Sequence, residues 1–168
     1  GGGDGIAYPI SPTGLAQSIA LTPTGKIVLA GSGPRPTPPG GIVYEGFCVA
    51  VLNADGTVDA TFSGDGVLNF EPSSVIVAGN YERAIGVAVT PAGQFLVGGT
   101  SLGSGFDVGG AYFGPFRSAT LVRLNADGTF DAALDGDGIA LHTNQLLGLD
   151  AANAAALQQD GKIVLAGS

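Results

Sequence analysis

Short runs of apolar residues alternate with glycine-bearing turns along the whole chain. Residues 25–32 read Gly-Lys-Ile-Val-Leu-Ala-Gly-Ser and return letter for letter at residues 161–168. A degenerate copy occupies residues 93–100, so the copies are evenly spaced by 68 residues (25 to 93 and 93 to 161). Ile-Val-Leu and its counterpart Phe-Leu-Val favour strands and are too short for a stable helix. The three copies therefore predict three equivalent β-strands.

Each copy follows another short apolar segment and a turn. Segments 15–21, 84–89 and 152–157 lead into Thr-Pro-Thr-Gly, Thr-Pro-Ala-Gly and Gln-Gln-Asp-Gly. Two strands joined by a tight turn that ends in glycine are typical of a β-hairpin, because glycine adopts positive φ readily. The alanine-rich segment 151–157 would favour a helix on propensity alone. Its alignment with two copies that do not look helical predicts a strand instead.

A second repeated block completes the pattern. Residues 47–59 match residues 119–131, and each block is followed by a Gly-Asp-Gly step, at Gly64 and Gly136, into a short strand. The same step occurs at Gly3. One unit therefore contains four strands, which we name a, b, c and d in chain order.

The pattern predicts eleven strands in a single all-β domain. They comprise strand d of a preceding unit in residues 1–14, whole units in residues 15–70 and 84–142, and a partial unit in residues 151–168. Repeats made of four consecutive strands are typical of propeller blades. The predicted fold class is all-β, with about two and a half to three β-propeller-like blades of four antiparallel strands.

These blocks resemble the delta-60 repeat, a bacterial family expected to form a β-propeller. The resemblance rests on residues 122–131, 136–139 and 157–168 and covers most of the chain outside two loops. The chain departs from the family pattern at Gln94 and Phe95, where Lys-Ile is typical, and in loops that are longer than usual. The family carries no defined activity. The resemblance implies a propeller fold and a secreted or cell-surface setting in bacteria, and no catalytic residues.

Composition narrows the class of protein further. The chain has 168 residues with 30 Gly and 10 Pro, and 45% hydrophobic residues are enough to fill a core. A net charge of −8 argues against nucleic acids and anionic membranes as partners, because both require a basic footprint. No apolar run has the length of a membrane-spanning helix. The single cysteine, Cys48, lies in an apolar strand and is interpreted as a small hydrophobic residue rather than a reactive thiol.

The number of strands bears on assembly. Propellers close with about four to eight blades, so eleven strands leave open strand edges. Open edges in water invite pairing with other chains. We favour the interpretation that the chain is a segment of a longer protein. The alternative is that several copies assemble edge to edge into a homo-oligomer.

Alternating strand direction sorts the connections onto two sides. The a–b and c–d connections share one side, which carries acidic turns. The b–c loops 33–46 and 102–117 and the d–a loop 71–83 share the other, which we call the loop side. Aromatic and arginine side chains on loops are typical anchors of interfaces. We predict that this side binds a protein or glycan through Arg35, Tyr44, Tyr81, Arg83, Phe106, Tyr112, Phe113, Phe116 and Arg117. The alternative is that the aromatic residues only pack the glycine-rich loops.

The acidic side offers one candidate metal site. Oxygen-bearing residues follow each other closely in the second c–d connection, and calcium prefers six to eight oxygen ligands on a tight loop. The EF-hand order is absent, however, and Asp-Gly pairs are ordinary turn sequences in which the aspartate caps its own backbone. We favour turn chemistry and predict no cofactor, with calcium as the alternative. The candidate ligands are Asn125, Asp127, Asp131, Asp135 and Asp137.

No catalytic constellation stands out. His142 is the only histidine and is interpreted as a surface or edge residue. No Gly-x-Ser-x-Gly elbow opens a helix, no glycine-rich run ends in Gly-Lys-Ser/Thr, and no carboxylate pair is distinguished. We predict a non-catalytic repeat scaffold or adhesion module that mediates protein interactions. The alternatives are structural self-assembly into a ring or fibre through open strand edges and, less favoured, a hydrolase fragment.

Overall fold

The computed structural model describes residues 14–34, 45–72, 82–106, 112–142, 151–158 and 163–167. For residues 103–106 and 112–116 it describes the backbone only. These residues form ten β-strands, and this part of the chain contains no helix. The eleventh predicted strand falls within residues 1–14, of which the structure describes only Gly14.

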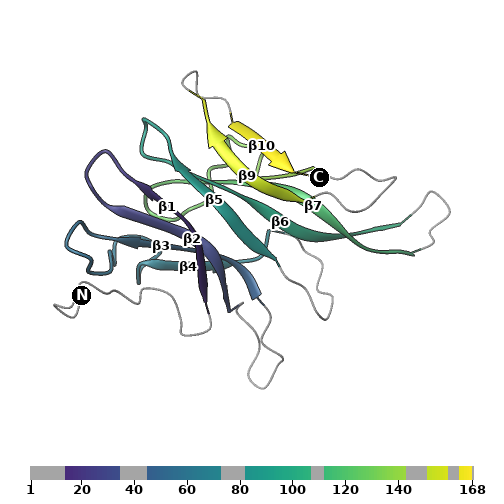
Figure 1. The fold of residues 1–168 in the computed structure, drawn as a ribbon, viewed down its shortest axis with the longest axis horizontal. Coiled ribbons are helices and arrows are strands. Elements are labelled where there is room, and N and C mark those ends of the chain that lie inside the picture. Colours follow the sequence, from purple (N-terminus) through teal and green to yellow (C-terminus); the bar gives the residue numbers. More distant parts are fainter. Residues whose placement is uncertain are drawn as a thin grey trace.

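The strands form three antiparallel sheets in chain order (Figure 1). The first sheet contains β1 (Leu15–Leu21), β2 (Ile27–Pro34), β3 (Glu45–Leu52) and β4 (Val67–Phe70). The second contains β5 (Arg83–Val89), β6 (Phe95–Phe106), β7 (Tyr112–Leu124) and β8 (Ile139–His142). The third pairs β9 (Ala152–Leu157) with β10 (Ile163–Gly167). The predicted all-β fold of propeller-like blades is confirmed, and the alanine-rich segment is a strand.

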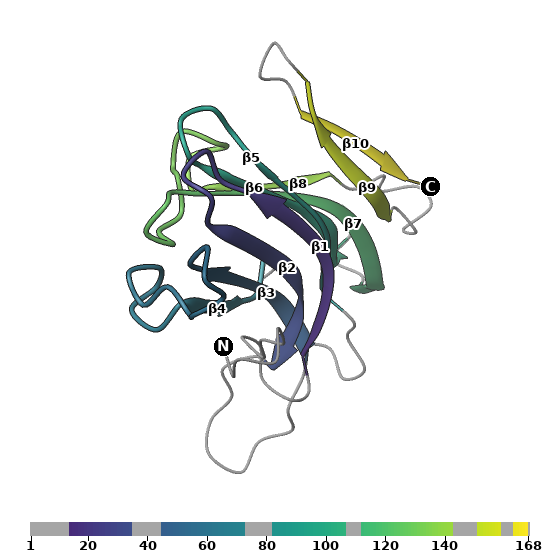
Figure 2. The same cartoon turned by 60° about the vertical axis from the view of Figure 1, so that its left-hand side comes forward.

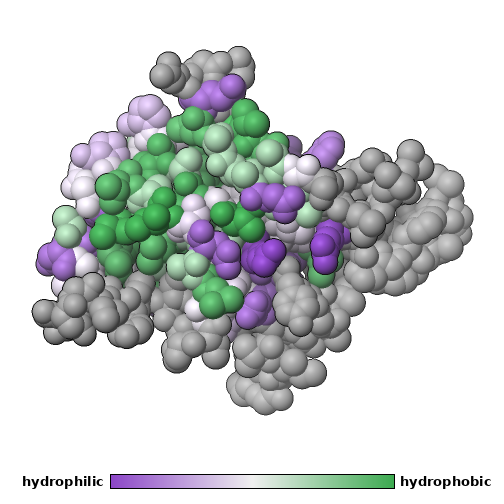
Figure 3. Space-filling model, viewed as in Figure 1, coloured by the Kyte–Doolittle hydropathy of each residue, from purple (hydrophilic) through white to green (hydrophobic). Residues whose placement is uncertain are grey.

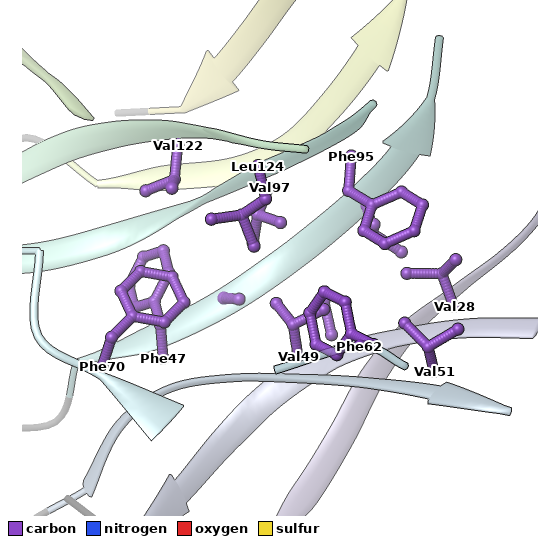
Figure 4. Close-up of a cluster of buried hydrophobic side chains, with 13 residues drawn as sticks. Val28, Phe47, Val49, Val51, Phe62, Phe70, Phe95, Val97, Val122 and Leu124 are labelled. Carbon is purple, nitrogen blue, oxygen red and sulfur yellow. The ribbon is translucent and has the colours of Figure 1, made fainter. Parts of the chain in front are cut away.

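The three sheets follow one another as layers, and their first strands β1, β5 and β9 lie next to each other (Figures 1 and 2). The core fills the space between the first two sheets, whose buried side chains point toward each other (Figure 4). Ala20, Leu68, Val89 and Ile139 pack against its margin. The core residues are Val28, Ala30, Phe47, Val49, Val51, Phe62, Phe70, Ala84, Val87, Phe95, Val97, Val122 and Leu124.

The predicted hairpin turns close in the same way in the first two sheets. The Gly25 amide donates to the Thr22 carbonyl at 2.9 Å, and the Gly93 amide donates to the Thr90 carbonyl at the same distance. Both glycines have φ of 83°, in the left-handed region that favours glycine. The third predicted corner, Gly161, lies outside the described residues.

A second set of glycines is required for close approach. Gly31, Gly99 and Gly167 share one position of the repeat and face the start of strands β1, β5 and β9, where each pairing has a register shift. A Cβ on Gly31 would lie 1.8 Å from the carbonyl oxygen of Leu15, the first residue of β1, and a Cβ on Gly167 would lie 1.8 Å from that of Ala151, just before β9. On Gly99 the distance would be 2.3 Å. Backbone contact therefore explains why the octapeptide carries glycine there in all three copies.

The predicted loop at residues 102–117 is wrong for most of its length. Strands β6 and β7 continue their ladder to the pairs Leu102–Arg117, Gly103–Phe116 and Phe106–Tyr112, with a register shift between Gly103 and Gly105. Only residues 107–111 between the two strands lie outside the description. The aromatic residues of this segment favour strands, and the shift absorbs the irregularity introduced by its glycines.

Candidate functional site

Hydrogen bonds between connections identify the two sides of the molecule. The Lys26 Nζ donates to Asp59 Oδ2 at 2.5 Å, which joins the first a–b turn to the first c–d connection. In the second sheet the Gln94 Nε2 donates to Asp131 Oδ2. The a–b and c–d connections therefore share one side, as predicted, and the strand ends of the loop side lie opposite.

The aspartates of the c–d connections bind their own backbone. The Asp127 Oδ1 accepts hydrogen bonds from the amide of Thr129 at 2.9 Å and from its hydroxyl at 2.7 Å. Asp131 accepts from the Ala133 amide at 3.0 Å, and Asp137 accepts from the Ile139 amide at 2.8 Å. These contacts two residues ahead are the Asx turns that Asp-Gly sequences favour.

The candidate calcium ligands do not form a common coordination site among the described residues. Among the described residues, no group of three or more His, Cys, Asp or Glu side chains could hold a metal ion. The Asn125 side chain donates to the Thr129 hydroxyl at 3.0 Å, and the Asp131 carboxylate also pairs with Arg123 at 2.8 Å. Asp135 has a φ of 50° at an exposed turn. The side chains of Asn125, Asp127, Asp131 and Asp137 therefore take part in turns and in an ion pair.

The hydrogen bond from Lys26 lowers the pKa of the Asp59 carboxyl, and that from Thr61 lowers it further. A lowered pKa in the folded state stabilises the fold above the unfolded pKa of about 3.9. This stabilisation is lost as the pH falls through the folded pKa. We expect Lys26→Ala to raise the pKa of Asp59 and to shift acid unfolding to a less acidic pH. NMR titration of the Asp59 carboxyl measures the first effect, and circular dichroism against pH measures the second.

Arg117→Ala is the control for this experiment, because it removes one positive charge from the loop side of the second sheet, away from Asp59. It should leave the Asp59 titration in place. An Asp59 pKa that stays the same in Lys26→Ala would contradict the assigned contact.

A basic pocket lies on the loop side, between the second and third sheets. Its volume is about 270 Å³, and its lining residues come from strands β5, β6 and β7 and from the start of β9. Arg83 is the first residue of β5. Arg117 lies on β7, where it pairs with Leu102 of β6. Both arginines are exposed. We call this the arginine pocket; it is lined by Arg83, Thr100, Arg117, Ala151, Ala152 and Asn153.

The two arginines depart from the repeat. At the position of Arg83 the first sheet has Leu15, and at the position of Arg117 it has Glu45. Neither guanidinium forms an ion pair within the described part of the chain, whereas Lys26 and Arg123 each pair with an aspartate on the opposite side. The repeat therefore does not account for the two arginines, because the equivalent positions of the first sheet carry other residue types.

Sequence reasoning missed three polar residues at or beside this pocket. Thr100 and Asn153 line it, and the Thr100 hydroxyl donates to the Ala152 carbonyl at 3.3 Å across the two sheets. Glu82 precedes Arg83, is fully buried and accepts from the Leu102 amide at 3.2 Å. Thr100 ends the degenerate octapeptide and Asn153 lies in an alanine-rich strand, so neither position carried a sequence signal.

The remaining predicted binding residues divide into two groups. Arg35, Tyr44 and Tyr81 lie outside the described residues. Phe106, Tyr112, Phe113 and Phe116 lie on β6 and β7, and the structure describes their backbone only. Within the predicted set, the structure therefore brings together Arg83 and Arg117.

The cysteine and the histidine singled out in the sequence lie in different surroundings. Cys48 is fully buried, and burial raises the pKa of its thiol to about 12, so the thiol stays protonated at neutral pH. His142 is exposed at the end of the edge strand β8, as predicted.

A second pocket, of about 460 Å³, is lined by the equivalent residues Leu21, Val89 and Leu157 and the turns that follow them. None of the described residues that line it is charged.

Of the comparisons with known proteins, the one with family models agrees with the observed architecture. No curated protein and no solved structure matches the chain. In the part of the chain that the structure describes, no helix is long and apolar enough to cross a membrane. Residues 107–133, which include the whole of β7 with Arg117, match the family model described as a domain of unknown function (DUF5122) beta-propeller.

Proposed function

We propose that the chain is a non-catalytic interaction module of a secreted or cell-surface bacterial protein of the delta-60 repeat type. The loop side contacts the partner, a protein or glycan, and the sheets serve as its scaffold. The proposal rests on one observation: Arg83 and Arg117 converge on a single pocket of the loop side. Adhesion to an extracellular partner is the role that this arrangement supports best.

The arginine pocket favours an anionic group on the partner. Arginine presents a planar set of donors that matches carboxylate and sulfate oxygens, and it keeps its charge at all physiological pH values. Thr100 and Asn153 add a hydroxyl and an amide beside the two guanidinium groups. The chain as a whole carries a net charge of −8, so an acidic partner is repelled elsewhere and attracted at this pocket.

Binding can be tested with two acidic polymers, polygalacturonate for glycans and poly-glutamate for proteins, with neutral dextran as the reference. We expect one of the acidic polymers to bind and the affinity to fall with added salt. In the double variant Arg83→Ala/Arg117→Ala we expect a loss of at least about tenfold, because charge-assisted hydrogen bonds contribute about 1.5–3 kcal/mol each. Titration calorimetry measures the affinity.

Lys26→Ala is the matched control, since it removes a positive charge from the opposite side, where Lys26 pairs with Asp59. It should bind the polymer like the unmodified chain. Failure of both acidic polymers to bind, or equal losses in the control and in the double variant, would contradict the proposed function.

A further inference from the structure

Each sheet has two faces of different character. One face carries mostly larger aliphatic or aromatic side chains on its first two strands, and we call it the large-residue face. It consists of Ile19, Leu21, Ile27 and Leu29 in the first sheet, Val87, Val89, Phe95 and Val97 in the second, and Ala155, Leu157, Ile163 and Leu165 in the third.

The opposite, small-residue face carries side chains that are mostly smaller at the neighbouring positions. It consists of Ser18, Ala20, Val28 and Ala30 in the first sheet, Gly86, Ala88, Leu96 and Gly98 in the second, and Ala154, Ala156, Val164 and Ala166 in the third.

Both interfaces within the molecule pair a small-residue face with a large-residue face. Between the first and second sheets, Val28 and Ala30 share one buried cluster with Val87 and Val97. The Ser18 hydroxyl also accepts a hydrogen bond from the Val87 amide at 3.1 Å.

Between the second and third sheets the contact is closer still. A Cβ on Gly98 would lie 2.7 Å from the Ala155 Cβ and 2.9 Å from Leu165 Cδ2. A Cβ on Gly86 would lie 3.0 Å from the Ala155 Cβ. The sheets therefore stack in one direction, small-residue face onto large-residue face.

Among the sheets that the structure describes, one face of each kind is not covered by another sheet. On the large-residue face of the first sheet, Ile19 is 64% exposed and Leu21 is 66% exposed, whereas the equivalent Val87 in the second sheet is 9% exposed. On the small-residue face of the third sheet, Val164 is 44% exposed, against 3% for the equivalent Leu96. Hydrophobic surface gathers over β1 and β5 in the space-filling view (Figure 3).

We infer that the large-residue face of the first sheet docks on the small-residue face of the third sheet of a second copy of this chain. This contact continues the internal interfaces, because it brings together the same repeat positions that pack between the sheets of one molecule. It joins two different surfaces, so it is head-to-tail and extends to a ring or a filament. The sequence suggested assembly through strand edges, whereas the packing between the sheets favours faces. The contact uses residues outside the arginine pocket.

Two blocking variants test the direction of docking. Ile19→Asp places a charge on the large-residue face of the first sheet, and Val164→Asp places one on the small-residue face of the third. Burying an unpaired carboxylate costs free energy, so each variant prevents docking at the face that carries the new charge. Each variant retains the other face. We expect the unmodified chain to form species larger than a monomer at about 100 μM, and each variant alone to be monomeric. Mixed in equal amounts, the two variants should form a one-to-one dimer and nothing larger.

Sedimentation equilibrium measures these masses, and circular dichroism checks that each variant folds. Leu21→Asp replaces Ile19→Asp if the latter does not fold. Leu141→Asp is the control, because Leu141 is 46% exposed on β8, away from both docking faces. It should assemble like the unmodified chain.

Three results would overturn the inference. The first is an unmodified chain that remains monomeric at the stated concentration. The second is a blocked variant that still associates with itself, which would indicate a symmetric contact. The third is a mixture of the two variants that stays monomeric.

Discussion

Gly31→Ala is expected to lower the free energy of unfolding by about 3 kcal/mol or more. The added Cβ would lie 1.8 Å from the Leu15 carbonyl oxygen, 2.8 Å from its carbon and 3.0 Å from the Ala16 Cα. All three are backbone atoms, so no side chain can rotate away to make room. Strand β1 must shift, and the pairing of Leu15 and Ala16 with β2 must open.

Gly93→Ala separates this steric effect from the ordinary cost of replacing glycine. Gly93 has a φ of 83°, but nothing lies within 4 Å of its added Cβ. We expect a loss of about 1 kcal/mol there, from backbone strain alone. Urea unfolding followed by circular dichroism gives both values. Equal losses in the two variants would mean that the close approach at Gly31 relaxes without cost.

The repeat made the architecture predictable, because spacing in the sequence maps directly onto equivalent strands. The octapeptide marked β2, β6 and β10, and alignment with the other copies overrode the helix propensity of the alanine-rich segment that forms β9. Asx turns such as that of Asp127 were also accessible, since an aspartate and the amide two residues later are local in sequence.

Features that depend on contacts between sheets were harder to predict from the sequence. Loop composition singled out Arg83 and Arg117, but their meeting with Thr100 and Asn153 depends on how the third sheet packs on the second. The ladder of β6 and β7 extends past the repeat into a glycine-rich segment that looked like a loop. Glycine composition does not distinguish a loop from a long hairpin when the cross-strand partners are unknown.

Phe62 shows how such a contact contributes to stability from outside the strands. It lies in the first c–d connection, is fully buried, and packs its ring 5.7 Å from that of Phe95 in the second sheet. The next residue, Ser63, donates its amide to the Asp127 carbonyl of the second connection at 2.8 Å. Phe62 therefore anchors the first blade on the second at the acidic side.

Phe62→Ala is expected to lower the free energy of unfolding by about 3–5 kcal/mol, the usual cost of removing a buried aromatic ring. Leu134→Ala is the matched control. Leu134 holds the same position of the second unit and its amide makes the same bond to an aspartate carbonyl, but its side chain is only half-buried. We expect a loss of roughly 1 kcal/mol there.

Urea unfolding compares the two variants, and hydrogen exchange at the Ser63 amide reports on the anchor itself. In Phe62→Ala the exchange should accelerate, because the bond to Asp127 is held in place by the ring packing beside it. Similar losses in both variants would show that the connection stabilises each blade separately. A larger loss at Phe62 together with faster exchange at Ser63 would place the stabilisation in the interface between the blades.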